Sequence, residues 1–218
     1  MEPTDQNRRA WDEMHHHNPR RAAASGLPAF VRTSLGELHG KRVLHLQCGT
    51  GEATAELAEL GASVTGVDVS PEALTAAGER WPAIAWVQGD VEALPAELQR
   101  GRFDLVYADD VLARLQDLAA WARAVAATLH PGGELLLFDE HPVQACVDAF
   151  DRWSEDYFAE PVRRLGQVVG AVAGTGLVIR AFEEYPAEGR GRDRLPGTFL
   201  LYARKPGATA TTPAGPSK

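Results

Sequence analysis

Glycines and acids at the ends of apolar runs are the residues of this sequence best suited to bind a ligand. Gly49 and Gly51 follow the run 42–46 and lead into a helical pattern that begins at Glu52. Such glycines let the backbone approach a ligand closely and place a helix N-terminus beside it. Asp68 ends the next apolar run, 17 residues beyond Gly51. A carboxylate there can accept hydrogen bonds from both hydroxyls of a ribose.

A second acid follows the third apolar run, in Gly89-Asp90-Val91. The Asp90 carboxylate is able to accept from an exocyclic amino group of a purine. A Gly-x-Gly turn by itself also fits a tight turn that packs a helix on a strand. The glycine turn together with Asp68 and Asp90 predicts an adenosine site.

The elements that position these residues alternate between strand and helix from residue 41 onward. Apolar runs bounded by Gly and Pro predict strands at 42–46, 63–67, 84–88, 103–108 and 134–138. Helical spacing predicts helices at 52–60, 70–80 and about 118–129. Ser70, Pro71 and Glu72 form a strong helix start, because Ser caps, Pro suits the first turn and the acid favours the positive helix end.

The chain after residue 140 predicts a different ending of the sheet. A helix is expected at 161–173, followed by strands at 177–182 and 198–203 with only a loop between them. Parallel strands need a long crossover, so these two strands should be antiparallel. We therefore predict an α/β fold with a mostly parallel seven-stranded sheet, one antiparallel strand and helices on both faces.

Five motifs occur in a fixed order: VLHLQCGTGE, VTGVDVSPEAL, QGDVEALP, FDLVYADDVL and LHPGGELLLFDEHP. As an ordered set, over residues 41–205, they resemble the class I S-adenosylmethionine-dependent methyltransferases. The chain is most similar to a branch with His-Leu-Gln-Cys in the first strand, His-Pro after the fifth and Leu-Pro before the last, as Leu195-Pro196. The resemblance implies a Rossmann-like fold and methyl transfer from S-adenosylmethionine to a small-molecule acceptor.

By the same resemblance, the cofactor is held by eight residues at the strand ends. The glycines shape the turn around the methionine portion, the first acid holds the ribose, the second acid and its neighbour address the adenine, and the end of strand four lines the site. These residues are Gln47, Gly49, Gly51, Asp68, Val69, Asp90, Val91 and Ala108.

Two positions depart from the commonest family pattern, which has an acid at His45 and a glycine at Gln47. Because Gln47 has a Cβ, we expect its backbone to avoid positive φ, with its carbonyl free to meet the ligand's ammonium group. We interpret His45 as a buried, hydrogen-bonded imidazole in preference to a ligand contact.

Methyl transfer needs an aligned nucleophile, and a base helps when the acceptor is a hydroxyl or a protonated amine. The candidates at this edge of the sheet are Asp109, Asp110, Asp139, Glu140 and His141. We hypothesise that His141 is the base, because its unperturbed pKa is near neutral. The alternative is that His141 only orients the turn before Pro142.

The predicted organisation is an N-terminal helical cap or lid over residues 1–40, a methyltransferase domain over 41–205 and a disordered tail over 206–218. Trp11 would belong to the lid or be a packing anchor. Three aromatic residues beyond the fifth strand are expected either to wall the acceptor site or to join the core: Trp153, Tyr157 and Phe158.

Composition narrows the classes of partner. A formal charge of -8 and a pI near 5.4 argue against binding to a nucleic-acid backbone. The sequence has no apolar run long enough to span a membrane and no secretory signal, so we expect a cytoplasmic protein with a small-molecule partner. Cys48 and Cys146 should be free thiols, and the run 15–17 of histidines should hold no metal, because neighbours on a helix point in different directions.

Two other functions stay open at this stage. A nicotinamide-dependent oxidoreductase is less favoured, because its fingerprint needs glycine where Thr54 or Gln47 stands. A methyltransferase-like protein that binds the nucleoside without catalysis also fits the altered first motif. The sequence does not identify the acceptor, the atom methylated or the oligomeric state.

Overall fold

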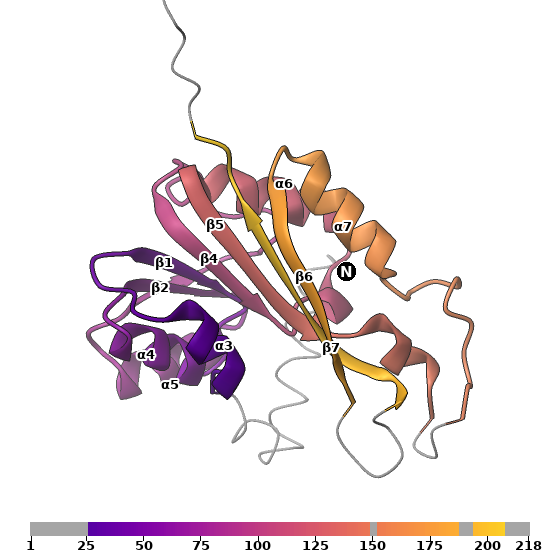
Figure 1. Ribbon diagram of the computed structural model, residues 1–218. Coiled ribbons are helices and arrows are strands. Elements are labelled where there is room, and N and C mark those ends of the chain that lie inside the picture. Colours follow the sequence, from indigo (N-terminus) through magenta and orange to yellow (C-terminus); the bar gives the residue numbers. More distant parts are fainter. Residues whose placement is uncertain (1–25, 149–151, 188–193, 208–218) are drawn as a thin grey trace, which may run out of the picture.

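The computed structural model describes residues 26–148, 152–187 and 194–207 and shows a twisted sheet with helices on both faces (Figure 1). Its strands are β1 (Arg42–Leu46), β2 (Ser63–Asp68), β3 (Ala85–Gln88), β4 (Phe103–Asp109), β5 (Leu129–Glu140), β6 (Val178–Pro186) and β7 (Pro196–Arg204). Its helices are α3 (Ala29–Leu35), α4 (Glu52–Glu59), α5 (Pro71–Arg80), α6 (Leu118–Thr128) and α7 (Leu165–Gly174), with short 3-10 helices η1 (Leu112–Arg114) and η2 (Pro142–Cys146).

The sheet has the order β3-β2-β1-β4-β5-β7-β6. Neighbours among β1 to β5 pair in parallel, whereas β7 is antiparallel to both β5 and β6. This arrangement confirms the predicted mainly parallel, seven-stranded sheet with one reversed strand. Strand order reverses between β1 and β4, which is where ligands bind in open sheets of this kind.

The core lies in two layers, one on each face of the sheet, because successive strand residues point to opposite faces. The α6 and α7 layer includes Leu44, Leu46, Val106, Trp121 and Val168. The α3 and α4 layer includes Val31, Val43, Leu57, Leu105 and Tyr107. Figure 1 shows α3, α4 and α5 on one side and α6 and α7 on the other, which confirms the prediction of helices on both faces.

Local signals explain most element boundaries. Ser70 Oγ accepts from the backbone N–H of Ala73 (3.2 Å) with Pro71 in the first turn, which confirms the predicted start of α5. The predicted start of β5 at residue 134 was late, because the strand begins at Leu129. Gly132 has φ 91°, and the pairing with β4 shifts register there, so the Pro-Gly-Gly segment forms a bulge inside the strand.

The helix predicted from residue 161 begins at Leu165. Arg164 is its N-cap residue, and the Gln167 side chain accepts from the Arg164 backbone N–H (3.0 Å). The hypotheses on Trp11 and the histidine run 15–17 fall outside the described residues, as does the predicted tail 206–218 from residue 208 onward. None of the described helices is long and apolar enough to cross a membrane.

Candidate active site

The carboxyl ends of the first four strands lie side by side and carry the residues predicted to hold the cofactor. Leu46 at the end of β1 is in register with Val67 of β2 and with Ala108 of β4, and Asp68 is in register with Gln88 of β3. The structure therefore brings the glycine turn and both acids to one edge of the sheet.

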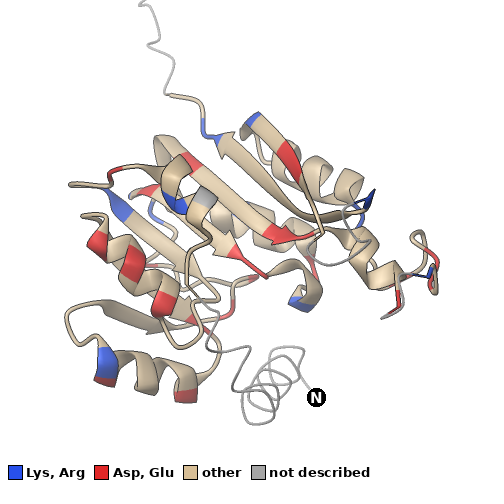
Figure 2. Ribbon diagram, turned by 60° about the horizontal axis from the view of Figure 1, so that its bottom comes forward, with Lys and Arg blue, Asp and Glu red and all other residues tan. Residues whose placement is uncertain are grey.

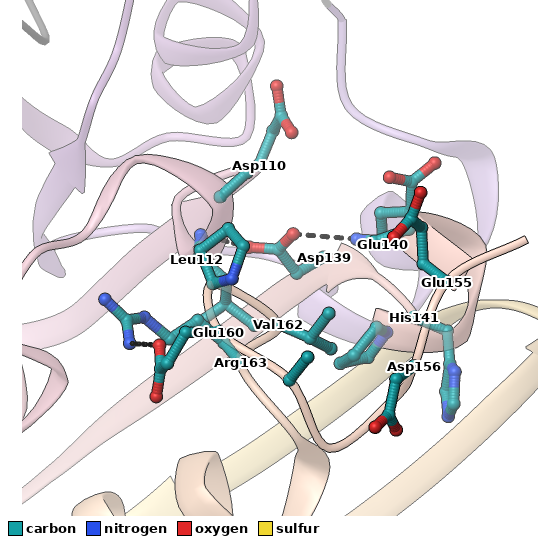
Figure 3. A pocket seen from close by; sticks show the side chains of 15 residues that line it. Asp110, Leu112, Asp139, Glu140, His141, Glu155, Asp156, Glu160, Val162 and Arg163 are labelled. Atoms are coloured by element: carbon teal, nitrogen blue, oxygen red, sulfur yellow. Dashed lines mark hydrogen bonds and ion pairs between the residues drawn. The ribbon is translucent and has the colours of Figure 1, made fainter.

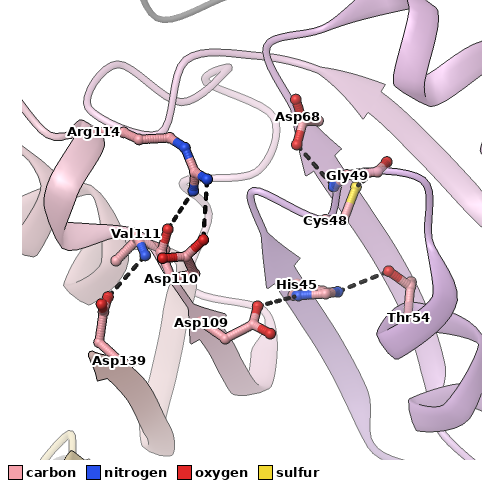
Figure 4. Close-up of polar contacts among 10 residues, drawn as sticks. All are labelled: His45, Cys48, Gly49, Thr54, Asp68, Asp109, Asp110, Val111, Arg114 and Asp139. Carbon is pink, nitrogen blue, oxygen red and sulfur yellow. Dashed lines mark hydrogen bonds and ion pairs between the residues drawn. The ribbon is translucent and has the colours of Figure 1, made fainter. Parts of the chain in front are cut away.

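The glycine turn is bound to Asp68 by a direct hydrogen bond. The backbone N–H of Gly49 donates to Asp68 Oδ2 (2.9 Å), and that of Ser70 donates to Oδ1 (2.9 Å), as Figure 4 shows for the first contact. Asp68 is 1% exposed. Burial raises the pKa of this carboxyl, while the two backbone donors act in the opposite direction. Asp68 thus fixes the turn after β1 relative to the end of β2.

The expectation that Gln47 avoids positive φ is wrong, since its φ is 54°. The chain has to turn after β1 so that the Cys48 N–H reaches the Val67 carbonyl (3.0 Å) and α4 can begin at Glu52, with Gly51 as its N-cap residue. That turn requires a left-handed residue, and glutamine adopts it at a strain of about 1–2 kcal/mol. Gln47 Oε1 is buried and makes no hydrogen bond with the described residues.

Gly51 is required by both its backbone and its surroundings. Its φ is 91°, and a Cβ there would lie 2.6 Å from the Trp86 ring and 3.1 Å from the Ala77 side chain. A side chain at this position would push the start of α4 away from α5 and β3. The close packing of the turn on Trp86 therefore depends on glycine.

The remaining predicted cofactor residues lie at the same edge with different exposure. Val69 is half-buried and its carbonyl accepts from Gln88 Nε2 (3.2 Å). Asp90 Oδ1 accepts from the backbone N–H of Glu92 (2.9 Å), which closes the loop after β3. Val91 is 5% exposed and Ala108 is fully buried.

His45 is buried and hydrogen-bonded at both ring nitrogens, as predicted. Nδ1 lies 2.7 Å from Thr54 Oγ1 of α4, and Nε2 lies 3.0 Å from Asp109 Oδ1 at the end of β4 (Figure 4). The ring is 1% exposed. One imidazole therefore ties the first turn of α4 to the end of β4. The sequence did not identify Thr54 as the hydrogen-bond partner of His45, because the two residues are nine positions apart and lie in different elements.

Asp139 organises the backbone that follows β4. Its Oδ2 accepts from the N–H groups of Val111 (2.8 Å) and Leu112 (3.0 Å), and its Oδ1 accepts from that of Glu140 (2.8 Å). The side chain is buried, and this burial raises the pKa of Asp139 to about 7. Neighbouring Asp110 adopts positive φ (49°) and pairs with Arg114 at 3.0 Å.

His141 caps η2 and contacts β6. Its Nδ1 accepts from the backbone N–H of Val143 (3.1 Å), so Nε2 carries the proton in the neutral ring. Nε2 lies 2.9 Å from Glu184 Oε1 without hydrogen-bond alignment. Burial is the largest influence on His141 and lowers its pKa, against the opposing effect of Glu184. This capping contact agrees with the alternative to the base hypothesis, in which His141 only orients the turn before Pro142.

A cavity of about 300 Å³ lies beside Asp139 and His141, between the ends of β4 and β5 and the segment 155–163 (Figure 3). Apolar groups of Leu112, Pro142 and Val162 contribute to its lining. Acids from several elements line it as well: Asp110, Asp139, Glu140, Glu155, Asp156 and Glu160.

The three aromatic residues considered for this wall lie elsewhere. Trp153 is 60% exposed and Phe158 is 73% exposed, so neither belongs to the core, and none of the three lines the cavity. Tyr157 instead accepts from the Leu165 N–H through its hydroxyl (3.2 Å). The wall is formed instead by acids and small apolar residues of the segment 155–163.

Both cysteines are free and buried, as expected. Within the described ranges, no group of three or more His, Cys, Asp or Glu side chains is placed to hold a metal ion.

The strand order, the reversed strand β7 and the glycine turn joined to the acid after β2 define the class I methyltransferase fold. A family model described as "Methyltransferase domain" matches residues 44–137. That match covers the glycine turn, Asp68, Asp90 and most of β5. Residues 44–137 thus match a methyltransferase domain.

Known proteins agree with this assignment. The chain is 42% identical over 107 residues to an uncharacterised methyltransferase of Synechocystis, covering 47% of this chain and 48% of that protein. It is 38% identical over 133 residues to a ubiquinone biosynthesis O-methyltransferase of Xanthomonas euvesicatoria, covering 59% of this chain and 55% of that protein. The chain therefore spans about half the length of the curated relatives it matches.

A solved structure extends the similarity over most of the chain. An S-adenosylmethionine dependent methyltransferase from Mesorhizobium loti superposes with a TM-score of 0.67 and 28% sequence identity. The superposition covers 80% of this chain and 95% of that protein. The shared fold includes the elements beyond residue 137.

Proposed function

We propose that the protein transfers a methyl group from S-adenosylmethionine to a small-molecule acceptor. The observation that carries this proposal is the hydrogen bond from the Gly49 N–H to Asp68. It holds the glycine turn against a carboxylate suited to a ribose, at the strand-order reversal. The methyltransferase domain match and the similar proteins support the same activity.

The residues at the turn fit this cofactor chemically. A carboxylate has about four lone-pair sites, and backbone donors use two of those on Asp68, which leaves acceptors for ribose hydroxyls. Gln47 Oε1 is a buried acceptor with no partner among the described residues. An ammonium group is the kind of donor that such an oxygen needs.

The proposed cofactor contacts follow the predicted set. Gln47, Gly49 and Gly51 would surround the methionine portion, and Asp68 with Val69 would hold the ribose. Asp90 and Val91 would contact the adenine, and the backbone of Ala108 would line the site.

S-adenosylmethionine supplies a methyl carbon bonded to a positively charged sulfur. When bound, it would donate this methyl group to a lone pair of the acceptor, and the electron pair of the broken C–S bond would stay on sulfur. The reaction needs a nucleophile held in line at about 3 Å. The cavity beside Asp139 is the proposed place for the acceptor, with Leu112 and Val162 excluding water from one part of it.

His141 stays our candidate for the group that accepts a proton from the acceptor. Its buried ring favours the neutral form, which is the form able to act as a base. To do so, Nδ1 must release the Val143 N–H. Full turnover by His141→Ala across neutral pH, with a verified acceptor, would assign His141 to the turn alone.

The partners follow from charge and from the site. The excess of acids disfavours a nucleic-acid backbone as acceptor, and the cavity volume suits a small metabolite. A cytoplasmic location is our prediction for this enzyme.

Calorimetric titration tests the cofactor. S-adenosylmethionine and S-adenosylhomocysteine are titrated into wild type and Asp68→Asn, with NAD and NADP as comparison ligands. Asp104→Asn is the matched control, because Asp104 also accepts from a backbone N–H, that of Arg42 (2.8 Å), but near the opposite ends of β1 and β4. Thermal unfolding of each variant shows that it is folded.

Binding by wild type and Asp104→Asn that is weakened at least tenfold in Asp68→Asn supports the proposal. Absence of binding by wild type, or preference for a nicotinamide cofactor, overturns it. Binding without transfer to any acceptor in a broad panel would identify a nucleoside-binding protein without catalysis.

A further inference from the structure

The cavity beside Asp139 and His141 is strongly unbalanced in charge. Its lining contains six acidic side chains and one guanidinium, that of Arg163, among the described residues (Figure 3). Burial raises the pKa of Asp139 to about 7, so the other five acids supply most of the negative charge at neutral pH. The acids come from the residue that follows β4, from β5 and from the segment 155–160, so they surround the space from several sides. Figure 2 shows the same excess of acidic positions at this end of the sheet.

The guanidinium of Arg163 is already bound to the protein. Its Nη2 donates to the carbonyls of Leu115 (2.9 Å) and Gln116 (3.0 Å), and its Nη1 lies 3.4 Å from Glu160 Oε2. A carboxylate or phosphate entering the cavity would have to displace these contacts to reach it. An anionic acceptor therefore gains little from Arg163 and meets repulsion from the surrounding acids.

Two buried polar side chains, His141 and Asp139, line the cavity. His141 is 6% exposed and lines the cavity, and its Nε2 makes no hydrogen bond within the described residues, although Glu184 lies 2.9 Å away. Asp139 is 3% exposed and lines the same space. The acids are too dispersed to form a metal-binding group in the described ranges. An organic cation is the ligand class that satisfies both the charge and the volume.

We infer that the methyl acceptor is a small organic cation, bearing at least one ammonium group and no carboxylate or phosphate. The inference rests on the proposed methyltransferase function and names the acceptor class of that site. The ammonium group is the recognition element, whichever atom of the acceptor is methylated. Ionic contacts with partly exposed acids are screened by salt, so recognition should weaken as ionic strength rises.

Three matched phenols test this inference: tyramine, the neutral alcohol tyrosol and 4-hydroxyphenylacetate. They differ in the charge of one side chain and are small enough for the cavity. Each is titrated into the full chain saturated with S-adenosylhomocysteine, in 20 mM and 500 mM NaCl. Binding of S-adenosylhomocysteine is measured on the same samples.

The variant Glu155→Gln/Asp156→Asn removes two charges from the cavity wall while keeping side-chain size. Asparagine at position 156 retains an oxygen for the Phe158 N–H (2.8 Å). Glu72→Gln/Glu79→Gln removes two exposed charges from α5, and neither residue lines the cavity. This control separates a local effect from a change in net charge.

We expect tyramine to bind at least tenfold more tightly than 4-hydroxyphenylacetate in 20 mM NaCl, with tyrosol between them. This advantage should shrink in 500 mM NaCl. It should also fall about three- to tenfold in Glu155→Gln/Asp156→Asn, as two ion pairs at a surface predict. The α5 control should bind like wild type.

Equal or tighter binding of 4-hydroxyphenylacetate overturns the inference, as does the absence of tyramine binding. Tyramine affinity unchanged by salt and by the cavity variant overturns it too. If S-adenosylhomocysteine still binds in these cases, only the acceptor class is wrong. Failure of S-adenosylhomocysteine to bind instead counts against the proposed function.

Discussion

Replacing His45 by aspartate tests whether the imidazole couples α4 to β4. Aspartate is the kind of residue that the commonest related pattern has at this position. Here it is expected to destabilise the protein, because the imidazole spans Thr54 Oγ1 at 2.7 Å and Asp109 Oδ1 at 3.0 Å inside the core. The shorter aspartate loses both contacts and brings a second carboxylate toward Asp109.

The size of the effect follows from three contributions. A lost neutral hydrogen bond costs about 1 kcal/mol and one to a charged group about 1.5–3 kcal/mol. Two carboxylates about 5 Å apart at an effective dielectric constant of about 20 repel by ~3 kcal/mol. The Asp109 side chain is 26% exposed, so screening reduces this repulsion to about 1–2 kcal/mol. The free energy of unfolding should fall by ~4 kcal/mol.

Urea unfolding at pH 7.5 measures the loss in His45→Asp, His45→Asn, Asp109→Asn and the double variant His45→Asp/Asp109→Asn. Asparagine has the size of aspartate without its charge, so His45→Asn should recover about 1–2 kcal/mol relative to His45→Asp. Asp109→Asn should be less harmful in the His45→Asp background than in wild type. Equal stability of His45→Asp and His45→Asn would refute the repulsion from Asp109. A loss below 1 kcal/mol in His45→Asp would refute the bridging role itself.

Three further outcomes are expected. Gln47→Gly should raise the free energy of unfolding by about 1 kcal/mol and Tm by about 2–4 °C, because it relieves a φ of 54°; a lower Tm would contradict this reading. Gly51→Ala should lower the free energy of unfolding by about 2–3 kcal/mol, since its Cβ meets the Trp86 ring at 2.6 Å, and a neutral effect in urea unfolding would contradict it. The pKa of Asp139, raised from 3.8 to about 7, means that this group's stabilisation is complete below pH 4 and is lost as the pH rises through 7. Asp139→Asn should therefore gain up to ~4 kcal/mol relative to wild type between pH 4 and pH 8, and parallel pH profiles of the two proteins would contradict this.

The parts of the fold that the sequence predicted are those encoded locally. Apolar runs bounded by glycine placed each of the first four strands within about a residue of its observed ends. Ser70 with Pro71 placed the start of α5, because a capping hydroxyl and a ring with fixed φ act within one turn. The antiparallel orientation of β7 was predicted from the short connection between β6 and β7, because a parallel pair of strands needs a longer crossover.

The parts that the sequence did not predict depend on contacts between distant segments. Positive φ at Gln47 contradicts the preference of a residue with a Cβ, and it is imposed by the pairing of Cys48 with β2. Helical spacing up to residue 129 and the Pro-Gly-Gly segment predicted that β5 begins at residue 134. The strand begins at Leu129, because Gly132 forms a bulge within it. Thr54 became the partner of His45 only once α4 had packed beside β1.

In the candidate site, too, the residues fixed by local sequence were predicted and those fixed by distant contacts were not. Asp68 and Asp90 could be placed because Asp68 ends β2 and Asp90 lies two residues beyond β3, so the sheet itself brings them to one edge. The wall formed by segment 155–163 could not be placed, because this segment has no strand or helix register to fix its direction. The aromatic residues near it were expected either to wall the acceptor site or to join the core, but Trp153 and Phe158 are exposed.

Two buried acids, Asp68 and Asp139, each hold a different backbone segment at this edge of the sheet. Asp68 holds the turn after β1 through the Gly49 N–H, whereas Asp139 holds the chain after β4 through the N–H groups of Val111 and Leu112. Each carboxylate fixes backbone in place, so the two backbone segments keep their shape independently of the segment 155–163. His45 joins them through Asp109. Substitutions in segment 155–163 should therefore change acceptor choice without changing cofactor affinity, which is why the acids of this wall are the residues to vary when the acceptor is sought.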